Sequence, residues 1–494
     1  MNRSTLSLAG AVVVLAVLTG AASLTGGDDS AAAPAGSAVR LPVQRSTLVC
    51  PAPSQSEFAD TTYASFTPVT TTEGGGTGTG SGTGSAQLAT AADKPTVLSP
   101  PLKQPGRTVT YTTEKTDAPA LVGTADGSLA PGWAAGQTTV VDAGPGRGLL
   151  GTSCLTPDSE FWFSGASTAD GRQDYLHLVD PDDAPAVVDI ELYGKDGLLK
   201  TSAGDGITVP GKGSTPVLLS TLATDKAADL TVHVVVRSGR VGAAVQATDA
   251  SHGADWLPPS AEPATTLVMP GIPADATSVQ LVAFAPGSDD ADLTVKLATS
   301  TGQISPAGHE TLHVKAGMTA SAALGDITKG DAGSLILTPG NLHAPVPVVA
   351  GLRITRGTGS KQEFAFLPAT AAIDTRASVA DNRDKAATLA LTALKEEARV
   401  KVTSWPGAAG GTAVSRTVEV KAGTTLSLQP VAATAGKGSF AVTVERLSGG
   451  SVYASRELAL PLNGVPMFTI QPLPDDRGTV EVPKAESDLT ILGK

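Results

Sequence analysis

The chain has 494 residues and carries 47 acidic against 35 basic side chains, for a net charge of −12. This balance argues against proteins that bind nucleic acid or an anionic membrane surface through a basic face. Aromatic residues make up only 4% of the chain, whereas glycines number 55 and prolines 35. Such a mix is typical of short strands separated by turns, and the length indicates several domains.

The first thirty residues predict an export signal. One arginine, Arg3, precedes an apolar run from Leu6 to Leu24 that only Ser, Gly and Thr interrupt. The run is close to the roughly 20 residues that span a bilayer, so residues 1–30 are either a cleaved signal peptide or an uncleaved membrane anchor. We therefore expect the remaining chain to be extracytoplasmic, either secreted or anchored to the cell membrane by this segment.

Cys50 and Cys154 are the two cysteines of the chain. In an exported protein an even number of cysteines is usually paired, which predicts a disulfide. Closing a loop of this length stabilises a fold by about 4–5 kcal/mol in the chain-entropy model. The alternative is a cysteine nucleophile, which needs a nearby histidine, and nothing marks His177, the nearest in sequence, as such a partner.

A unit of about a hundred residues recurs along the chain. Three segments each contain a strand, a glycine turn and a second strand, and their turn residues Gly213, Gly317 and Gly423 are 104 and 106 residues apart. Strands such as 187–193 alternate polar and apolar residues. This pattern predicts an all-β fold of about four tandem immunoglobulin-like β-sandwich domains.

The repeats set the expected domain boundaries. The predicted sandwiches are 31–158, 159–258, 259–359 and 360–461, followed by a C-terminal strand and tail over 462–494. The first is degenerate and contains a Gly/Ser/Thr-rich loop, 70–97, which carries no fold information. Residues 387–400 have helical propensity, but their register with the other copies predicts a strand.

Aromatic residues gather at "EFWFSGAS" (160–167). If exposed, Trp162 and Phe161 could stack on a sugar ring. The alternative, which we favour, is that they pack beside the disulfide or at the joint between the first two units. Trp133 and Trp256 lie in loops rich in proline and glycine, where ligand contact and packing are equally defensible.

Acidic turns recur at equivalent positions of the repeats and could bind Ca²⁺ through carboxylate oxygens. The candidate ligands are Asp180, Asp182, Asp183, Asp289, Asp290 and Asp292. The alternative is that Asp favours turns because it accepts hydrogen bonds from its own backbone. Arg383 and Lys385 in the third copy favour this second interpretation, and calcium stays open at the first two copies.

The string "GHETLHVKAG" contains an H-E-x-x-H pattern formed by His309, Glu310 and His313. On a helix this spacing places two imidazoles on one zinc ion. Here Thr311 and His313 alternate with Leu312, which is a strand pattern, and on a strand residues i and i+4 lie about 13 Å apart. A third ligand is also missing, so we predict neither a metal site nor a cofactor.

Four longer stretches carry a family resemblance. They are "CPAPSQSEFADTTYASFTPV", "APALVGTADGSLAPGWAAGQTT", "GRGLLGTSCLTPDSEFWFSGAST" and "VVDIELYGKDG". The chain resembles an uncharacterised family of actinobacterial, streptomycete-like envelope proteins, a domain of unknown function. The resemblance implies export and implies no activity or catalytic residue.

These observations favour an exported, non-enzymatic cell-envelope protein that acts as a scaffold or protein-interaction module and binds envelope proteins through edge strands and grooves between units. The alternative is a module that binds cell-wall glycan through exposed tryptophans. A remote alternative is a hydrolase with an inter-domain site, although no G-x-S-x-G elbow or triad pattern is present. Such a site would show as polar residues of two units that converge in one pocket.

Overall fold

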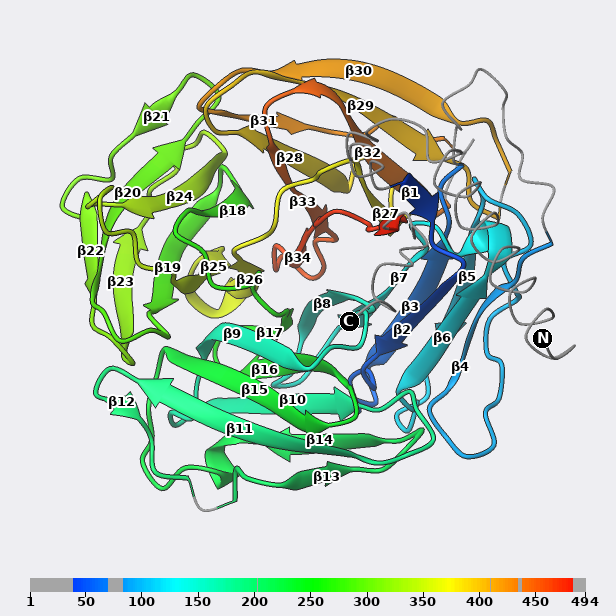
Figure 1. Ribbon diagram of the computed structural model, residues 1–494, viewed down its shortest axis with the longest axis horizontal. Coiled ribbons are helices and arrows are strands. Elements are labelled where there is room, and N and C mark those ends of the chain that lie inside the picture. The colour runs from blue at the N-terminus through cyan, green and yellow to red at the C-terminus, as the bar shows by residue number, and fades with distance from the viewer. Residues whose placement is uncertain (1–38, 70–82, 202, 409, 434–437, 483–494) are drawn as a thin grey trace, which may run out of the picture. The chain divides into compact units, whose positions relative to one another are not determined.

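The computed structural model describes residues 39–69, 83–201, 203–408, 410–433 and 438–482 (Figure 1). The predicted export segment, 1–30, lies outside these residues. Within them, no helix is both long and apolar enough to cross a membrane. Residues 42–479 form one compact unit. The strands β1 (Val39–Pro42) and β35 (Thr479–Val482) pair as a separate two-stranded sheet.

The prediction of an all-β fold is confirmed. The described residues contain strands and three single-turn 3-10 helices, and every registered strand pair inside residues 42–479 is antiparallel. Residues 387–400, despite their helical propensity, form parts of two strands as expected. Burial of Leu389 and Leu391 in a sandwich core overrides the local preference.

Four β-sandwich repeats follow one another along the chain. The first contains β2 (Arg45–Cys50), β3 (Ala59–Phe66), β4 (Ala86–Thr90), β5 (Thr108–Thr113), β6 (Leu121–Asp126), η1 (Gly127–Leu129), β7 (Ala134–Val141) and β8 (Gly148–Ser153). The second contains β9 (Glu160–Ala166), β10 (Arg172–Val179), β11 (Ala186–Gly194), β12 (Gly197–Leu198), β13 (Ile207–Val209), β14 (Ser214–Leu218), η2 (Leu219–Thr221), β15 (Leu230–Ser238), β16 (Gly242–Asp249) and β17 (Gly253–Leu257).

The last two repeats have the same plan. The third contains β18 (Leu267–Ile272), β19 (Ala276–Phe284), β20 (Ala291–Ala298), β21 (Gln303–Ile304), β22 (Thr311–Val314), β23 (Thr319–Gly325), β24 (Gly333–Pro339), β25 (Val349–Arg356), η3 (Gly359–Lys361) and β26 (Glu363–Pro368). The fourth contains β27 (Arg376–Asn382), β28 (Ala387–Ala393), β29 (Ala398–Trp405), β30 (Val414–Val420), β31 (Thr424–Leu428), β32 (Phe440–Gly449), β33 (Val452–Ala459) and β34 (Phe468–Pro472).

Strand order is the same in each repeat. One sheet has its strands in the order β9-β15-β11 in the second repeat, and the other sheet has the order β14-β10-β16-β17; the equivalent strands pair in the same way in the other three repeats. The pairing assigns β26 to the third repeat and β34 to the fourth, past the predicted ends at 359 and 461. β4 lies inside the segment 70–97, which was wrongly expected to be a loop throughout, because Ala86 and Leu88 point into the core.

The side-chain alternation that predicted the sandwiches is realised in the cores. On β11, Val188, Ile190 and Leu192 are fully buried, whereas the residues between them are partly exposed. Each repeat has a main apolar cluster of this kind, and burying one such side chain contributes about 1.5–3 kcal/mol.

The final strands of the four repeats contact one another in a closed cycle. β8 contacts β17, β17 contacts β26, β26 contacts β34, and β34 contacts β8 (Figure 1). We call these four strands the hub. Because they are covered on both faces, their residues are almost all buried and show no alternation of polar and apolar side chains.

Each pair of neighbouring repeats also shares an apolar joint, and between the first and second repeats Val49 packs with Val179. Trp162 packs on Phe284 between the second and third repeats, and Val268 packs with Tyr453 between the third and fourth. Phe66 contacts Trp405 between the fourth and first repeats, where the ring centroids are 6.0 Å apart. The four repeats of residues 42–479 are therefore joined on both sides, unlike domains on flexible linkers.

The predicted disulfide between Cys50 and Cys154 is confirmed, with a Cα–Cα distance of 4.4 Å. Cys50 ends β2, the first strand of the first repeat, and Cys154 directly follows β8, its last strand. The bond thus ties the beginning of this repeat to its hub strand.

Candidate functional site

A polar cavity of about 390 Å³ lies where the second and third repeats meet. Every residue that lines it has a polar or charged side chain. The lining residues are Asp229, His252, Ser278, Gln280, Arg353, Thr355 and Gln362. Polar residues of two repeats therefore converge in one place.

The floor of the cavity is the outer face of a sheet in the third repeat. Ser278 is opposite Thr355, and Gln280 is opposite Arg353, across the neighbouring strands β19 and β25. Successive side chains of a strand point to opposite faces, so these four share one face while Val279, between them, points into the core. The regular sheet thus sets the spacing of the floor.

Two turns of the second repeat form the walls. Asp229 precedes β15 with a φ of 53°, in the left-handed region that Asp and Asn enter more readily than other residues with a Cβ. The side-chain amide of Gln280 donates a hydrogen bond of 2.9 Å to Oδ2 of Asp229. His252 lies in the turn between β16 and β17.

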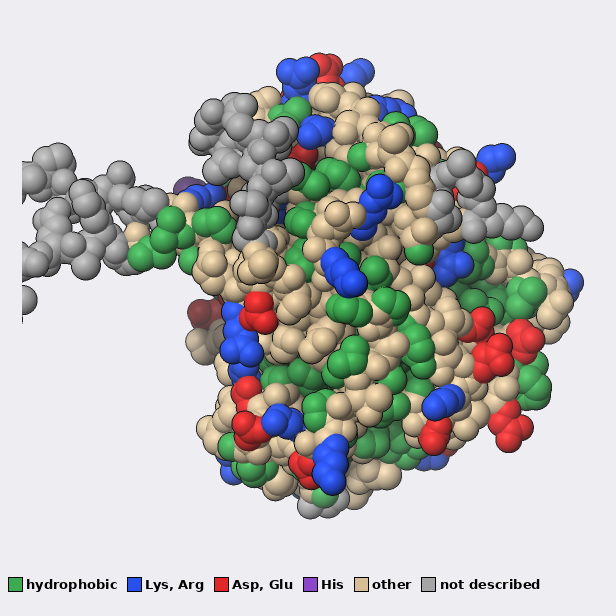
Figure 2. Space-filling view, turned by 90° about the vertical axis from the view of Figure 1, so that its right-hand side faces the viewer, with side chains coloured by type: hydrophobic (Ala, Val, Ile, Leu, Met, Phe, Trp, Pro, Cys, Tyr) green, Lys and Arg blue, Asp and Glu red, His purple; other side chains and the backbone are tan. Residues whose placement is uncertain are grey.

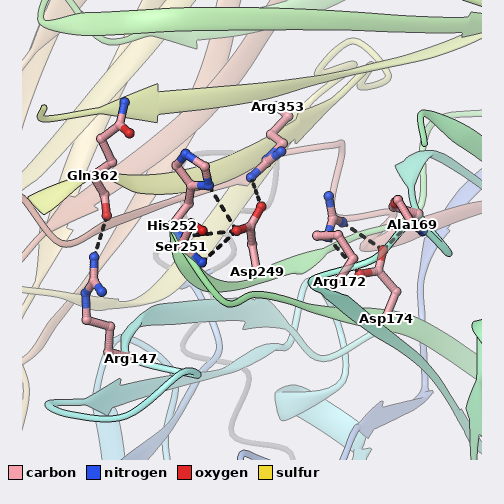
Figure 3. Close-up of polar contacts among 10 residues, drawn as sticks. Arg147, Ala169, Arg172, Asp174, Asp249, Ser251, His252, Arg353 and Gln362 are labelled. Atoms are coloured by element: carbon pink, nitrogen blue, oxygen red, sulfur yellow. Dashed lines mark hydrogen bonds and ion pairs between the residues drawn. The ribbon is translucent and has the colours of Figure 1, made fainter. Parts of the chain in front are cut away.

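Asp249, at the end of β16, contacts both His252 and Arg353 of the cavity lining (Figure 3). Its carboxylate oxygens lie 2.7 Å from Nη2 of Arg353 and 2.9 Å from Nδ1 of His252, and Oδ1 accepts a hydrogen bond from the backbone N–H of Ser251. Burial alone would raise the pKa of Asp249, but these partners lower it to about 2. The carboxylate is therefore ionised and the Arg353 charge is matched.

The first repeat reaches the same region through its last loop. Nη2 of Arg147 donates to the carbonyl oxygen of Gln362 at 2.8 Å (Figure 3). It also donates to the carbonyl oxygen of Ser360 at 3.1 Å. Arg353 is also held from below, since its guanidinium lies 4.4 Å from the centroid of the Phe364 ring. Three repeats thus fix the geometry around the cavity.

Among the residues that line the cavity, His252 is the one whose side chain can act as a general base. Asp249 orients its ring, as a carboxylate orients a histidine base in hydrolases. However, no hydroxyl group of a described residue is hydrogen-bonded to His252, whereas an activated nucleophile needs such a bond. The arrangement offers hydrogen-bonding groups rather than an assembled nucleophile.

A second set of titratable groups lies in the hub, away from solvent. Asp255 is fully buried and accepts hydrogen bonds from the backbone N–H of Gly151 and from Oγ1 of Thr469, which links three repeats. Glu363 accepts a bond of 2.8 Å from the backbone N–H of Leu149. Burial raises the pKa of Glu363 to about 8 and that of Asp255 well above its ordinary value.

The aromatic residues considered as possible ligand contacts are all buried, which agrees with the packing role favoured for Trp162 and Phe161. Trp162 stacks on His233, with ring centroids 3.6 Å apart, and is covered by Phe284 of the third repeat. Phe161 points into the core of the second repeat. Both faces of β9 are buried, because the third repeat covers the face that would otherwise be exposed.

Trp133 and Trp256 are buried as well. Nε1 of Trp133 donates to Oγ of Ser65 at 2.8 Å inside the first repeat. Trp256 is fully buried on the hub strand β17 and meets the ring of His177 edge-on. Their packing leaves no ring face for a sugar.

The acidic turn of the second repeat is occupied by protein groups. Asp180 is buried and accepts a hydrogen bond from the backbone N–H of Asp182. Asp182 forms an ion pair of 2.9 Å with Arg240, and Asp183 pairs with Lys212. These contacts match the interpretation of the turn as a backbone feature.

The turn of the third repeat makes similar contacts. Asp290 accepts a hydrogen bond of 2.9 Å from the backbone N–H of Ala316, and Asp292 pairs with His313 at 2.7 Å. Asp289 is exposed. Across the described part of the chain, no three His, Cys, Asp or Glu side chains are arranged to hold a metal ion.

The H-E-x-x-H string is not on a helix. His309 and Glu310 precede β22 in a turn where the carboxylate of Glu310 accepts a bond from the backbone N–H of Gly308. His313 is on β22 and lies opposite Asp292 of the neighbouring strand β20. The predicted strand conformation of this segment is confirmed for residues 311–314.

A comparison with protein-family models finds a match over residues 109–431, well over half of the chain. The chain belongs to DUF5719, a family of unknown function. The DUF5719 match extends from β5 of the first repeat to the loop after β31 of the fourth, and includes every residue that lines the cavity. No curated protein matches the chain.

The sequence analysis did not single out any of the cavity residues. Gln280 and Arg353 belong to strands more than 70 positions apart, and no local motif connects them. The available signal was weaker: Gln280 and Arg353 are long polar side chains in strands whose flanking residues are mostly apolar.

Proposed function

We propose that this protein is an exported, non-enzymatic component of the cell envelope that acts as a scaffold for other envelope proteins. The observation that carries the proposal is the closed cycle of hub contacts among the four repeats. Because the repeats are joined, the positions of their loops and edge strands are fixed relative to one another, as a scaffold requires. The predicted segment 1–30 and the disulfide support export.

An edge strand supplies the interaction surface in this proposal. β30 is at the end of its sheet, and most of its side chains are exposed. The unpaired backbone groups of such an edge can pair with an extended segment of a partner. Figure 2 shows acidic and basic side chains interspersed on one face, which together with the net charge of −12 favours protein partners over nucleic acid.

The test is cross-linking in intact host cells. The full chain would carry a photo-reactive residue at Thr417 on β30, or, as a control, at the exposed Lys195 in the second repeat. We expect the residue at Thr417, but not the residue at Lys195, to form a cross-link to one discrete envelope protein. We also expect protease added to the outside of cells stripped of their cell wall to digest the chain. A chain that stays in the cytoplasm, or that yields no partner specific to Thr417, would overturn the proposal.

A hydrolase with an inter-domain site is the second candidate, favoured by one observation. His252 is oriented by Asp249 in a cavity that Ser278 also lines. Treatment of the full chain with a fluorophosphonate probe separates the two candidates, because the probe labels only activated serines. Labelling that disappears in Ser278→Ala would establish the hydrolase, whereas an unlabelled chain would support the scaffold.

A further inference from the structure

We propose that the cavity between the second and third repeats binds a small, neutral, polyhydroxylated molecule, namely a saccharide unit. The proposal goes beyond the scaffold role and does not depend on it. A volume of about 390 Å³ is near the lower end of the range for pockets that bind small ligands, roughly 300–1,000 Å³. The cavity therefore suits a small molecule and not a peptide.

Several hydrogen-bonding groups in the lining have no partner among the residues that the structure describes. Gln280 uses its amide N–H on Asp229 Oδ2, which leaves Oε1 of Gln280 and Oδ1 of Asp229 as acceptors. The ring of His252 contacts Asp249 through Nδ1, which leaves Nε2 for a ligand. Acceptors and donors thus occur together.

Hydroxyl groups suit this mixture because each one donates one hydrogen bond and accepts two. One hydroxyl of a saccharide can donate to the Asp229 carboxylate, and another can accept from the side-chain amide of Gln362. The hydroxyls of Ser278 and Thr355 add two adaptable partners on the floor. A ligand with several adjacent hydroxyls can therefore satisfy all of these groups together.

The charges around the cavity favour a neutral ligand over an anion. The positive charge of Arg353 is already matched by Asp249 at 2.7 Å. An anion would in addition face the carboxylate of Asp229, which is hydrogen-bonded to the neutral side chain of Gln280. A neutral ligand does not encounter this repulsion.

The groups are positioned before any ligand arrives. Arg353 is fixed between Asp249 and the Phe364 ring, and the floor residues are on paired strands. Little side-chain freedom remains to be lost on binding, which lowers the entropic cost.

The experiment is saturation-transfer difference NMR on the full chain with two probes, glucose and N-acetylglucosamine, and with inorganic phosphate as a competitor. The variants are Asp229→Asn and Gln280→Ala, and Gln303→Ala, an exposed glutamine of the same repeat, is the matched control. Asn tolerates the left-handed backbone at residue 229, so Asp229→Asn removes the charge without disturbing the turn. Circular dichroism confirms that each variant is folded.

We expect saturation transfer to at least one of the two sugars, with phosphate unable to displace it. Asp229→Asn and Gln280→Ala should each weaken sugar binding about tenfold, while Gln303→Ala should leave it unchanged. Absence of transfer to both sugars would overturn the proposal. So would displacement of the sugar by phosphate, or full binding by the Asp229→Asn and Gln280→Ala variants.

Discussion

The hub and the cavity both contain polar side chains where repeats meet, but these side chains differ in their access to solvent. In the hub, Asp255 and Glu363 are buried and accept hydrogen bonds from backbone N–H groups of the first repeat. In the cavity, Ser278 and Gln280 keep hydrogen-bonding groups that no other described residue uses. Polar residues at a joint therefore stabilise the assembly when neighbouring backbone satisfies them, and remain available to a ligand when it does not.

Truncation of a hub side chain should have the largest effect on stability. We expect Trp256→Ala to lower the free energy of unfolding by about 3–5 kcal/mol, because it leaves a cavity among the strands β3, β7, β8 and β16. Gln362→Ala, in the cavity lining, should change it by no more than about 0.5 kcal/mol. Urea unfolding followed by circular dichroism compares the two, and equal effects would contradict the distinction between hub and cavity.

Trp162→Ala should cost slightly less, about 3 kcal/mol, since Trp162 is at the edge of a joint rather than in the hub. The same variant separates the packing role from a ligand role. It should leave pelleting of the full chain with cell-wall sacculi unchanged once only folded protein is counted. If folded Trp162→Ala protein no longer pelleted with the sacculi, Trp162 would have a role in ligand binding.

The pH dependence of stability should report the buried Glu363. Its folded-state pKa of about 8 exceeds the ordinary value of 4.5, so between these pH values the folded chain binds a proton that the unfolded chain does not. Its contribution to stability is therefore present below pH 4.5 and is lost as the pH rises to about 8. Glu363→Gln should flatten this slope in unfolding measurements between pH 5 and 9, and an unchanged slope would contradict it.

His313→Ala should have the smallest effect. His313 is half exposed, and its partners Asp290 and Asp292 are on the surface, so the variant should unfold at the same urea concentration as the parent. Metal analysis of the dialysed full chain gives the second measurement. One zinc ion per chain that is lost in His313→Ala would contradict the strand interpretation of residues 309–313.

The sequence was sufficient to predict what local patterns encode. Alternation along strands such as β11 gave the sandwiches, the recurring glycine turns gave the repeat, and the cysteine count gave the disulfide. These features depend on neighbouring residues or on simple counting. They can therefore be predicted without knowing how the repeats pack against one another.

Such local patterns could not predict the hub or the cavity. The hub strand "EFAFLP" is buried on both faces, so it lacks the alternation by which strands were recognised. Trp162 was expected to pack beside the disulfide or between the first two units, but it packs against the third repeat, which covers the outer face of β9. The cavity depends on the same contact between repeats, which a single sequence does not display.

Calorimetric unfolding of the full chain tests most directly whether the hub joins the four repeats into one unit. The account predicts one transition over residues 42–479, with equal calorimetric and van't Hoff enthalpies, and a transition that shifts as a whole in Trp256→Ala. Two or more separate transitions, only one of which moves in Trp256→Ala, would contradict it. The repeats would then be independent domains, and the cavity between two of them would not be a fixed site.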